Sequence, residues 1–301
     1  MKGRKMSKEY NTKIIRYPDS VEIIKYGESR TRGAPVSRRL KPLDEEDSKE
    51  DEAQRTLAQA YRIKRKVKHY AIANDFNLFW TLTFDDAKVN ASDYTYSRKR
   101  LSAWLKYQRE KYGRFGYLFF PELHPTSGRI HFHGLTENFS PPLVEARNAK
   151  TNRLIRKNGV QVYNAPTWKN GFSTVSEIND KAKTASYISK YITKELIEIP
   201  TAYNQPRYFV SRGLKLPEIT YETWGTEQLQ EFTPSFVVGD MSSETGGFKP
   251  KVSIYHLNVS EEQFTQSTPP ETVYKLTNYA NKQIANEPPT AYIDNLSNVD
   301  N

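Results

Sequence analysis

The alternation of apolar and polar positions predicts two helices around a buried strand in the first half of the chain. Over residues 53–74, apolar side chains recur every three or four positions, as in an amphipathic helix. The run Leu78–Phe84 is rich in aromatic and β-branched residues, which favour a buried strand. A second helix is expected to start after Ser92 or Asp93, either of which can cap it, and to end near Tyr112.

The pattern continues with a hairpin, a strand and a third helix. Only four residues separate two strand-like segments, 117–124 and 129–135, so these segments should form a β-hairpin. Residues 136–170 are polar and contain three prolines, which predicts a long loop or a weak pair of strands. A fourth strand is expected over 172–178, followed by a helix from Asp180 to about residue 197.

This order of elements predicts an α+β fold, in which helices pack on a central antiparallel sheet of four to five strands. Residues 53–217 would form that domain, which begins with a basic helix. Residues 1–52 lack apolar periodicity and end in an acidic run, so we expect a mobile basic and acidic arm there. Residues 218–301 are acidic and proline-containing, which predicts a partly extended or disordered C-terminal region.

The distribution of charge favours a polyanionic partner. The 301 residues include 45 Lys and Arg against 35 Asp and Glu, a net charge of +10, and the pI is about 9.4. The chain up to Pro206 carries +15 and the remainder −5, so a basic body precedes an acidic tail. A merely solubilising surface would explain the charge equally well. Five basic residues crowd the first helix and could face DNA phosphates, unless they form an ordinary solvated surface: Arg62, Lys64, Arg65, Lys66 and Lys68.

Cysteine is absent, which excludes disulfides, Cys-ligated zinc and a thiol nucleophile. No apolar run approaches the ~18–20 residues of a membrane span. The first ten residues also lack the apolar stretch of a secretory signal. We therefore expect a cytoplasmic protein without a membrane partner.

The predicted hairpin brings a possible metal site together. His131 and His133 are two residues apart on one strand and therefore lie on the same face. Counting back through the four-residue turn places Glu122 opposite His131, on that face. Two imidazoles and a carboxylate form a divalent-metal site that keeps positions open for substrate. His124 shares the face nearer the turn and is a less favoured third ligand, and a sheet face with hydrogen-bonded histidines is the alternative without metal.

The last predicted helix carries two tyrosines, each followed three residues later by a lysine. Tyr187, Lys190, Tyr191 and Lys194 share one stripe of that helix, because residues three and four apart are neighbours. A phenol, with a pKa of ~10, needs help to act as a nucleophile, and a nearby cation favours the phenolate. Partly buried structural tyrosines are the alternative for this stripe.

In combination these motifs resemble the HUH endonuclease superfamily, in particular the rolling-circle replication initiators of bacterial plasmids and small single-stranded DNA phages. The resemblance covers about residues 70–217. It rests on four segments, namely the strand Phe79–Phe84, the histidine hairpin through Gly134, the tyrosine helix Ala185–Lys194 and the segment Arg207–Pro217 that follows it.

The resemblance implies an RRM or ferredoxin-like core and Mg²⁺ or Mn²⁺ held by His131, His133 and Glu122. Tyr187 would match the principal nucleophile and Tyr191 the second tyrosine of two-tyrosine initiators, although one-tyrosine relatives also carry this spelling. Such enzymes nick single-stranded origin DNA, often in an extruded hairpin, form a 5′-phosphotyrosine adduct with a free 3′-OH, and later rejoin the strand.

Further roles follow from the same resemblance. Lys190 and Lys194 would favour the phenolate or neutralise the phosphate, and Arg129 on the hairpin would contact DNA. A sequence of the form GxxxxGK[ST] is absent, so a host helicase would unwind the duplex and a host polymerase would extend the 3′-OH. The gene would belong to a plasmid or phage in a bacterial cell.

Several alternatives stay open at this point. A relaxase or a single-strand transposase is built on the same core. Two histidines and a carboxylate also form the Fe(II) site of some oxygenases, although the tyrosine helix would then have no role. A non-catalytic DNA-binding protein with a structural histidine hairpin is the fourth interpretation.

Overall fold

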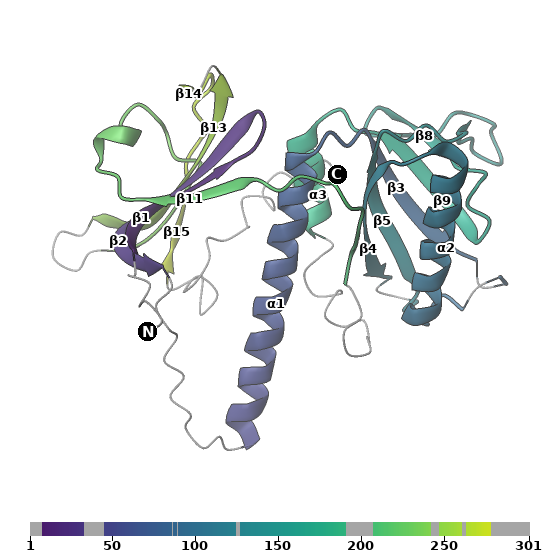
Figure 1. Ribbon diagram of the computed structural model, residues 1–301, viewed down its shortest axis with the longest axis horizontal. Coiled ribbons are helices and arrows are strands. Elements are labelled where there is room, and N and C mark those ends of the chain that lie inside the picture. The colour runs from purple at the N-terminus through teal and green to yellow at the C-terminus, as the bar shows by residue number, and fades with distance from the viewer. Residues whose placement is uncertain are drawn as a thin grey trace, which may run out of the picture. The chain divides into compact units, whose positions relative to one another are not determined.

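The computed structural model divides the chain into two compact units with mostly β-structure (Figure 1). The central unit comprises residues 43–216, and the terminal unit combines residues 1–42 with 217–301. The structure describes residues 8–32, 45–85, 87–88, 90–124, 127–190, 207–241, 247–260 and 263–277.

The central unit is built on an eight-stranded sheet in which each strand pairs antiparallel with its neighbours. Its order is β10-β4-β5-β3-β9-β8-β6, with β7 paired to β8. The strands, in chain order, are β3 (Leu78–Phe84), β4 (Gly116–Leu123), β5 (Ile130–Glu137), β6 (Val144–Glu145), β7 (Arg156–Lys157), β8 (Val160–Asn164), β9 (Gly171–Glu177) and β10 (Phe209–Val210).

Three helices cover the two faces of this sheet. Helices α1 (Glu45–Ala73) and α3 (Lys181–Lys190) pack on one face, and α2 (Tyr94–Tyr112) packs on the other (Figure 1). The predicted cap of α2 is confirmed, since the Asp93 carboxylate accepts a hydrogen bond from the backbone N of Tyr96 at 3.1 Å. No helix among the described residues is long and apolar enough to cross a membrane.

The start of α3 is also as predicted. The Asp180 carboxylate accepts a hydrogen bond from the backbone N of Lys183 at 2.8 Å and thereby satisfies one of the unpaired amide groups at the helix start. The predicted continuation of this helix to residue 197 lies outside the described residues.

The face under α2 is a continuous aromatic core. Trp80, Phe119 and Phe132 from three neighbouring strands are fully buried against Trp104 of α2. Gly134 on β5 is required by this packing, because a Cβ there would lie 2.2 Å from the ring of Phe119. The opposite face has a smaller apolar core, in which Leu118, Phe120 and Leu135 contact Val67, Ala71, Ala185 and Ile188 of α1 and α3.

The sheet is larger than the four to five strands that the sequence predicted. The four core strands β3, β4, β5 and β9 were expected, and the excess comes from short strands at the two edges. Strands β6, β7 and β8 lie in the polar segment 136–170, and β10 pairs with β4 through Phe209 and Phe119. Strands of two to five residues carry too few positions for a hydrophobic period, so the sequence pattern shows them weakly. The fold is mixed α and β with two sheets.

The terminal unit is a separate seven-stranded sheet in the order β11-β1-β2-β13-β12-β15, with β14 paired to β13. Its apolar core contains Ile14, Val21, Ile23, Leu229 and Leu257. A 3-10 helix spans Glu227–Leu229. The strands are β1 (Lys8–Arg16), β2 (Ser20–Arg32), β11 (Glu218–Glu222), β12 (Phe236–Met241), β13 (Phe248–Ser260), β14 (Gln263–Thr265) and β15 (Val273–Leu276).

Two segments therefore differ from the sequence prediction. Residues 8–32 lie in the expected mobile arm but form two long strands, and residues 218–276 contain five more strands of the same sheet. The physical reason is distance along the chain, since β1 pairs with β11 and β2 with β13, more than 190 residues later. Short apolar pairs such as Ile14-Ile15 and Ile23-Ile24 form a core only when those remote strands cover both faces.

Candidate active site

The β4-β5 hairpin has the register that the sequence predicted. Glu122 is the direct cross-strand partner of His131, and Phe120 is the partner of His133. The backbone N of His124 donates to the carbonyl of Arg129 at 2.7 Å, which closes the hairpin beside Gly128. Gly128 has a φ of 63°, a left-handed conformation that glycine adopts without steric cost. The turn thus places both histidines and Glu122 on the face that α1 and α3 partly cover.

Threonines of the neighbouring strand orient the two imidazole rings. The Thr83 hydroxyl lies 3.3 Å from Nδ1 of His131, and the Thr81 hydroxyl lies 3.2 Å from Nδ1 of His133. A hydroxyl can either donate or accept, so these contacts serve either tautomer of the ring. In both residues Nε2 is the nitrogen left for a further partner, and fixing the other nitrogen is a common way to orient a metal-binding histidine.

Glu122 lies against the more buried of the two histidines. Its carboxylate oxygen Oε2 is hydrogen-bonded to Nε2 of His133, whose side chain is almost fully buried. Burial, together with the charge of His133, lowers the pKa of His131 below its usual value. The neutral imidazole is the form that binds a metal ion.

The donor set fits a divalent metal in its chemistry. Two imidazole nitrogens and one carboxylate come from adjacent strands and the same face. Within the described part of the chain, however, no three His, Asp or Glu side chains are grouped closely enough to hold an ion as they stand. Glu122 would have to exchange its hydrogen bond with His133 for a shared ligand.

His124 lies beside this set on the exposed end of the hairpin. Its ring stacks on the ring of His131, with 5.6 Å between the centroids, and its Nδ1 accepts a hydrogen bond from the backbone N of Ser127 at 3.3 Å. Glu122 is the cross-strand partner of His131 and contacts His133, whereas His124 contacts His131. Glu122 therefore remains the better candidate for the third ligand.

Tyr187 lies next to the histidine face through a single aromatic side chain. The ring of Phe79 on β3 stacks on His133 with 5.9 Å between centroids, and the same ring meets Tyr187 edge-on at 5.6 Å. Ala185 and Ile188, the apolar stripe of α3, are buried in the core beneath. The sequence predicted both stripes, and the structure brings the first tyrosine to the same face as the two histidines.

Lys157 is a neighbour of Tyr187 that the sequence did not indicate. Its Nζ donates to the Tyr187 hydroxyl oxygen at 3.3 Å and lies 5.5 Å from the centre of the ring. Lys157 reaches this position because β7 pairs with β8, in the segment interpreted as a loop or a weak strand pair. Only the general excess of basic residues there could have suggested it.

Phe172 is a second residue that the sequence did not single out. It is the cross-strand partner of Thr83, the residue that holds His131, and its side chain is 72% exposed. An exposed aromatic ring on the same face as the histidines is a surface on which an unpaired base could stack. Its signal in the sequence, one phenylalanine in a strand of alternating residues, is indistinguishable from a core position.

The remaining predicted residues fall in different places. Arg62 and Lys66 are exposed on α1, whereas Lys64, Arg65 and Lys68 are half-buried along the same helix. Arg129 is exposed at the end of the hairpin, close to the histidines in sequence. Lys190 is the last residue of α3, and Tyr191 and Lys194 lie outside the described residues.

The charge is divided unequally between the two units. The central unit contains 29 basic and 19 acidic side chains, and the terminal unit contains 16 of each. The whole net charge of +10 therefore belongs to the unit that carries the histidines and Tyr187.

Comparison with known families gives one match. Residues 77–196 match the model of a family of replication-associated proteins, the ORF2 family, and the match covers less than half of the chain. The matched segment runs from the start of β3 to beyond α3 and includes Glu122, both hairpin histidines and Tyr187. No curated protein and no solved structure matches the chain. The similarity to replication-associated proteins is consistent with a role in the initiation of DNA replication.

Proposed function

We propose that this protein is a rolling-circle replication initiator that nicks single-stranded origin DNA through Tyr187. The observation that carries the proposal is the short chain of contacts from Glu122 through His133 and Phe79 to Tyr187. All four residues lie within the segment that matches replication-associated proteins. The antiparallel sheet that presents them is compatible with an HUH core.

His131, His133 and Glu122 would hold Mg²⁺ or Mn²⁺ in this proposal. A bound divalent ion supplies positive charge to a scissile phosphate and thereby stabilises the charge that develops in the transition state. Thr81 and Thr83 orient the two rings from the neighbouring strand, so that both Nε2 atoms are available on one face.

Tyr187 would be the nucleophile. Its hydroxyl oxygen forms a bond to phosphorus while the bond from phosphorus to the 3′ oxygen breaks. The phenol loses its proton as it attacks, and the departing oxygen takes up a proton from water, which leaves a 5′-phosphotyrosine and a free 3′-OH. Lys157 donates to the attacking oxygen and is placed to neutralise charge on the phosphate.

The surface around Tyr187 suits a single strand of DNA. Phe172 offers an exposed ring on the face of the histidines, where a base next to the scissile phosphate could stack. Arg62, Lys66 and Arg129 are exposed cations of the same unit, and the positive net charge of this unit would hold the phosphate backbone through release of counterions.

After one round of synthesis, a second attack would rejoin the displaced strand. The free 3′-OH can reverse the reaction at Tyr187, and Tyr191 with Lys194 would supply a second nucleophile in a two-tyrosine scheme. Lys190 would assist either tyrosine. A host polymerase would extend the 3′-OH and a host helicase would open the duplex.

A denaturing gel tests the proposal. The protein is incubated with Mn²⁺ or Mg²⁺ and labelled oligonucleotides that tile its own origin, and a covalent product is separated from free DNA. We expect an adduct that requires the metal and disappears in Tyr187→Phe. Tyr163→Phe is the matched control, because Tyr163 packs against the aromatic core under α2 and should leave the product unchanged.

Three outcomes would contradict the proposal. DNA binding without any adduct across the tiled origin would favour a non-catalytic DNA-binding protein. An adduct that persists in Tyr187→Phe and disappears in Tyr191→Phe would assign the reaction to the second tyrosine. Activity on transfer-origin or transposon-end DNA alone would indicate a relaxase or a transposase.

A further inference from the structure

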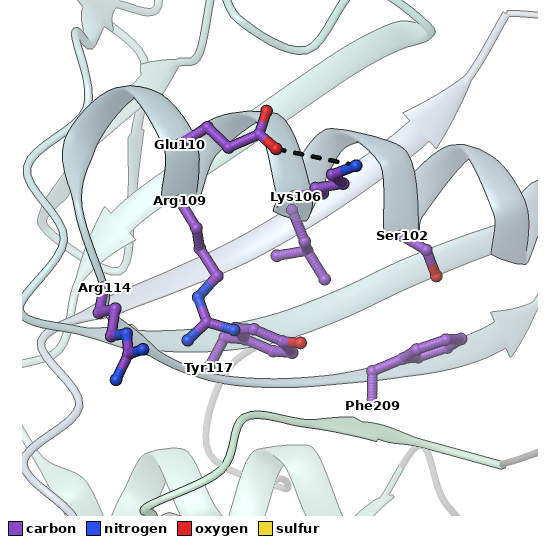
Figure 2. A pocket seen from close by; sticks show the side chains of 8 residues that line it. Ser102, Lys106, Arg109, Glu110, Arg114, Tyr117 and Phe209 are labelled. Atoms are coloured by element: carbon purple, nitrogen blue, oxygen red, sulfur yellow. Dashed lines mark ion pairs between the residues drawn. The ribbon is translucent and has the colours of Figure 1, made fainter.

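A groove lies on the α2 side of the central sheet, on the opposite face from the histidines. It consists of two adjoining cavities of about 450 and 600 Å³. Arg109 and Arg114 near the end of α2, together with Tyr117 on β4, line both cavities, so the two form one continuous hollow. Figure 2 shows the first cavity, with Arg109 extending from the helix toward the ring of Tyr117 and with Phe209 farther along the same floor.

The groove is strongly positive. Arg109, Arg114 and Arg212 line it, and none of these three forms an ion pair with a carboxylate among the described residues. Glu110 at the rim is already paired with Lys106 at 3.8 Å (Figure 2). Glu137 at the far end accepts a hydrogen bond from the backbone N of Asp75 at 3.1 Å. Three guanidinium groups without a counter-ion are well suited to bind phosphate groups.

The floor of the groove is aromatic and rigidly held. The Arg109 guanidinium lies over the ring of Tyr117, 5.9 Å from its centre. The backbone of Tyr117 is fixed on both sides by Ser211, whose hydroxyl accepts from the Tyr117 N at 3.0 Å and whose own N donates to the Tyr117 carbonyl at 2.9 Å. A fixed ring beside an arginine provides a stacking surface for a nucleobase at little cost in entropy.

We propose that this groove is a second binding site for single-stranded DNA, in which Tyr117 and Phe209 stack bases and Arg109, Arg114 and Arg212 bind phosphates. Two joined cavities fit a polymer better than a single nucleotide. A duplex keeps its bases stacked inside, so only an unpaired strand can place a base on Tyr117. The identity of the ligand as DNA rests on the function proposed above.

The groove and the histidine face hold different nucleotides of the strand. Tyr117 and Glu122 are on the same strand β4 but point to opposite faces, and five residues of a strand span about 17 Å. The groove is therefore an anchor remote from the cleavage site, which would keep hold of one part of the strand while another part is cut and released.

Fluorescence anisotropy with a labelled oligothymidine in EDTA tests the groove without any cleavage. We expect R109A/R114A to reduce the slope of log affinity against log salt by about 1.4, because a single strand loses ~0.7 per phosphate contact. Tyr117→Leu should weaken binding about 5- to 150-fold and leave the salt slope unchanged, as expected for loss of stacking. R100A/K111A is the matched control, because it removes two cations from another stripe of α2 and should keep the wild-type slope.

The outcomes separate this proposal from the proposed function. A wild-type slope and affinity in R109A/R114A, with unchanged thermal unfolding, would refute the groove even if the adduct with Tyr187 forms normally. An equal loss in R100A/K111A would refute it as well, since binding would then follow general charge. Loss confined to the groove variants would support the site even if the protein never forms an adduct.

Discussion

The two faces of the central sheet carry different kinds of side chain on the same strands. On β5, Ile130 and Phe132 point into the aromatic core under α2, whereas His131 and His133 alternate with them on the other face. On β3, Leu82 is buried on one side and Thr81 and Thr83 hold the imidazoles on the other. Alternate residues of one hairpin thus divide stability from chemistry, and a tightly packed face provides the rigid support that a reactive face requires.

Phe132→Ala should cause the largest change and affect mainly stability. Removing a fully buried phenylalanine typically costs about 3–5 kcal/mol, through lost burial and the cavity that remains. Chemical denaturation measures the loss. Molecules that stay folded at low temperature should still form the adduct, and Phe172→Ala, on the exposed face, should change stability by less than about 0.5 kcal/mol. Equal destabilisation by the two variants would contradict the division between the faces.

His131→Ala should reverse that pattern. Changes to residues that merely support a metal ligand typically cost 10- to 100-fold, so loss of a ligand should slow adduct formation by at least about 100-fold. Because His131 is only partly buried, the free energy of unfolding should change by less than about 1 kcal/mol. The rate of adduct formation in Mn²⁺ and a denaturation curve give the two values.

His124→Ala is the control for the choice of the third ligand. His124 stacks on His131 from the exposed end of the hairpin, so its loss should reduce the rate less than tenfold. A reduction as large as that of His131→Ala would assign His124, and not Glu122, to the ligand set.

Phe172→Ala should weaken binding of short oligonucleotides without changing the fold. Stacking of a base on an aromatic ring contributes about 1–3 kcal/mol, which corresponds to about 5- to 150-fold in affinity. Phe172→Tyr retains the ring and should bind like the wild-type protein. Anisotropy with an oligonucleotide that spans the nick site measures the difference, and equal affinity of all three proteins would show that Phe172 stacks no base.

Lys157→Gln should have the smallest effect of the series, a decrease of about tenfold in the rate of adduct formation. A hydrogen bond from a charged group contributes about 1.5–3 kcal/mol, and solvent exposure reduces this value. Lys150→Gln removes an equal charge from an exposed turn of the same unit and should leave the rate unchanged. Identical rates in Lys157→Gln and the wild-type protein would remove Lys157 from the site.

The sequence was sufficient for the hairpin because its geometry is local. A four-residue turn and the two-residue period of a strand together place Glu122 opposite His131, and the structure has that register. The strand Leu78–Phe84 and the caps of α2 and α3 were predictable for the same reason, since each depends on neighbours within a few residues. The similarity of residues 77–196 to replication-associated proteins covers this locally determined region.

Features that depend on remote segments could not be predicted in this way. The strands in residues 8–32 need partners beyond Pro217, so their apolar pairs suggested an unstructured arm. Lys157 and Phe172 gain their importance only from the residues opposite them, Tyr187 in one case and Thr83 in the other. Arg109, Arg114 and Arg212 form a groove because β10 pairs with β4 about 90 residues away in the chain.

The most direct test of the central claim is mass spectrometry of the covalent product. Wild-type protein that has reacted with origin DNA in Mn²⁺ is digested with protease and nuclease, and the peptide that carries the residual nucleotide is sequenced. Our account predicts a phosphodiester link between a 5′-nucleotide and the hydroxyl of Tyr187. Attachment at Tyr191 alone, at any residue outside α3, or at the 3′ end of the DNA would contradict it.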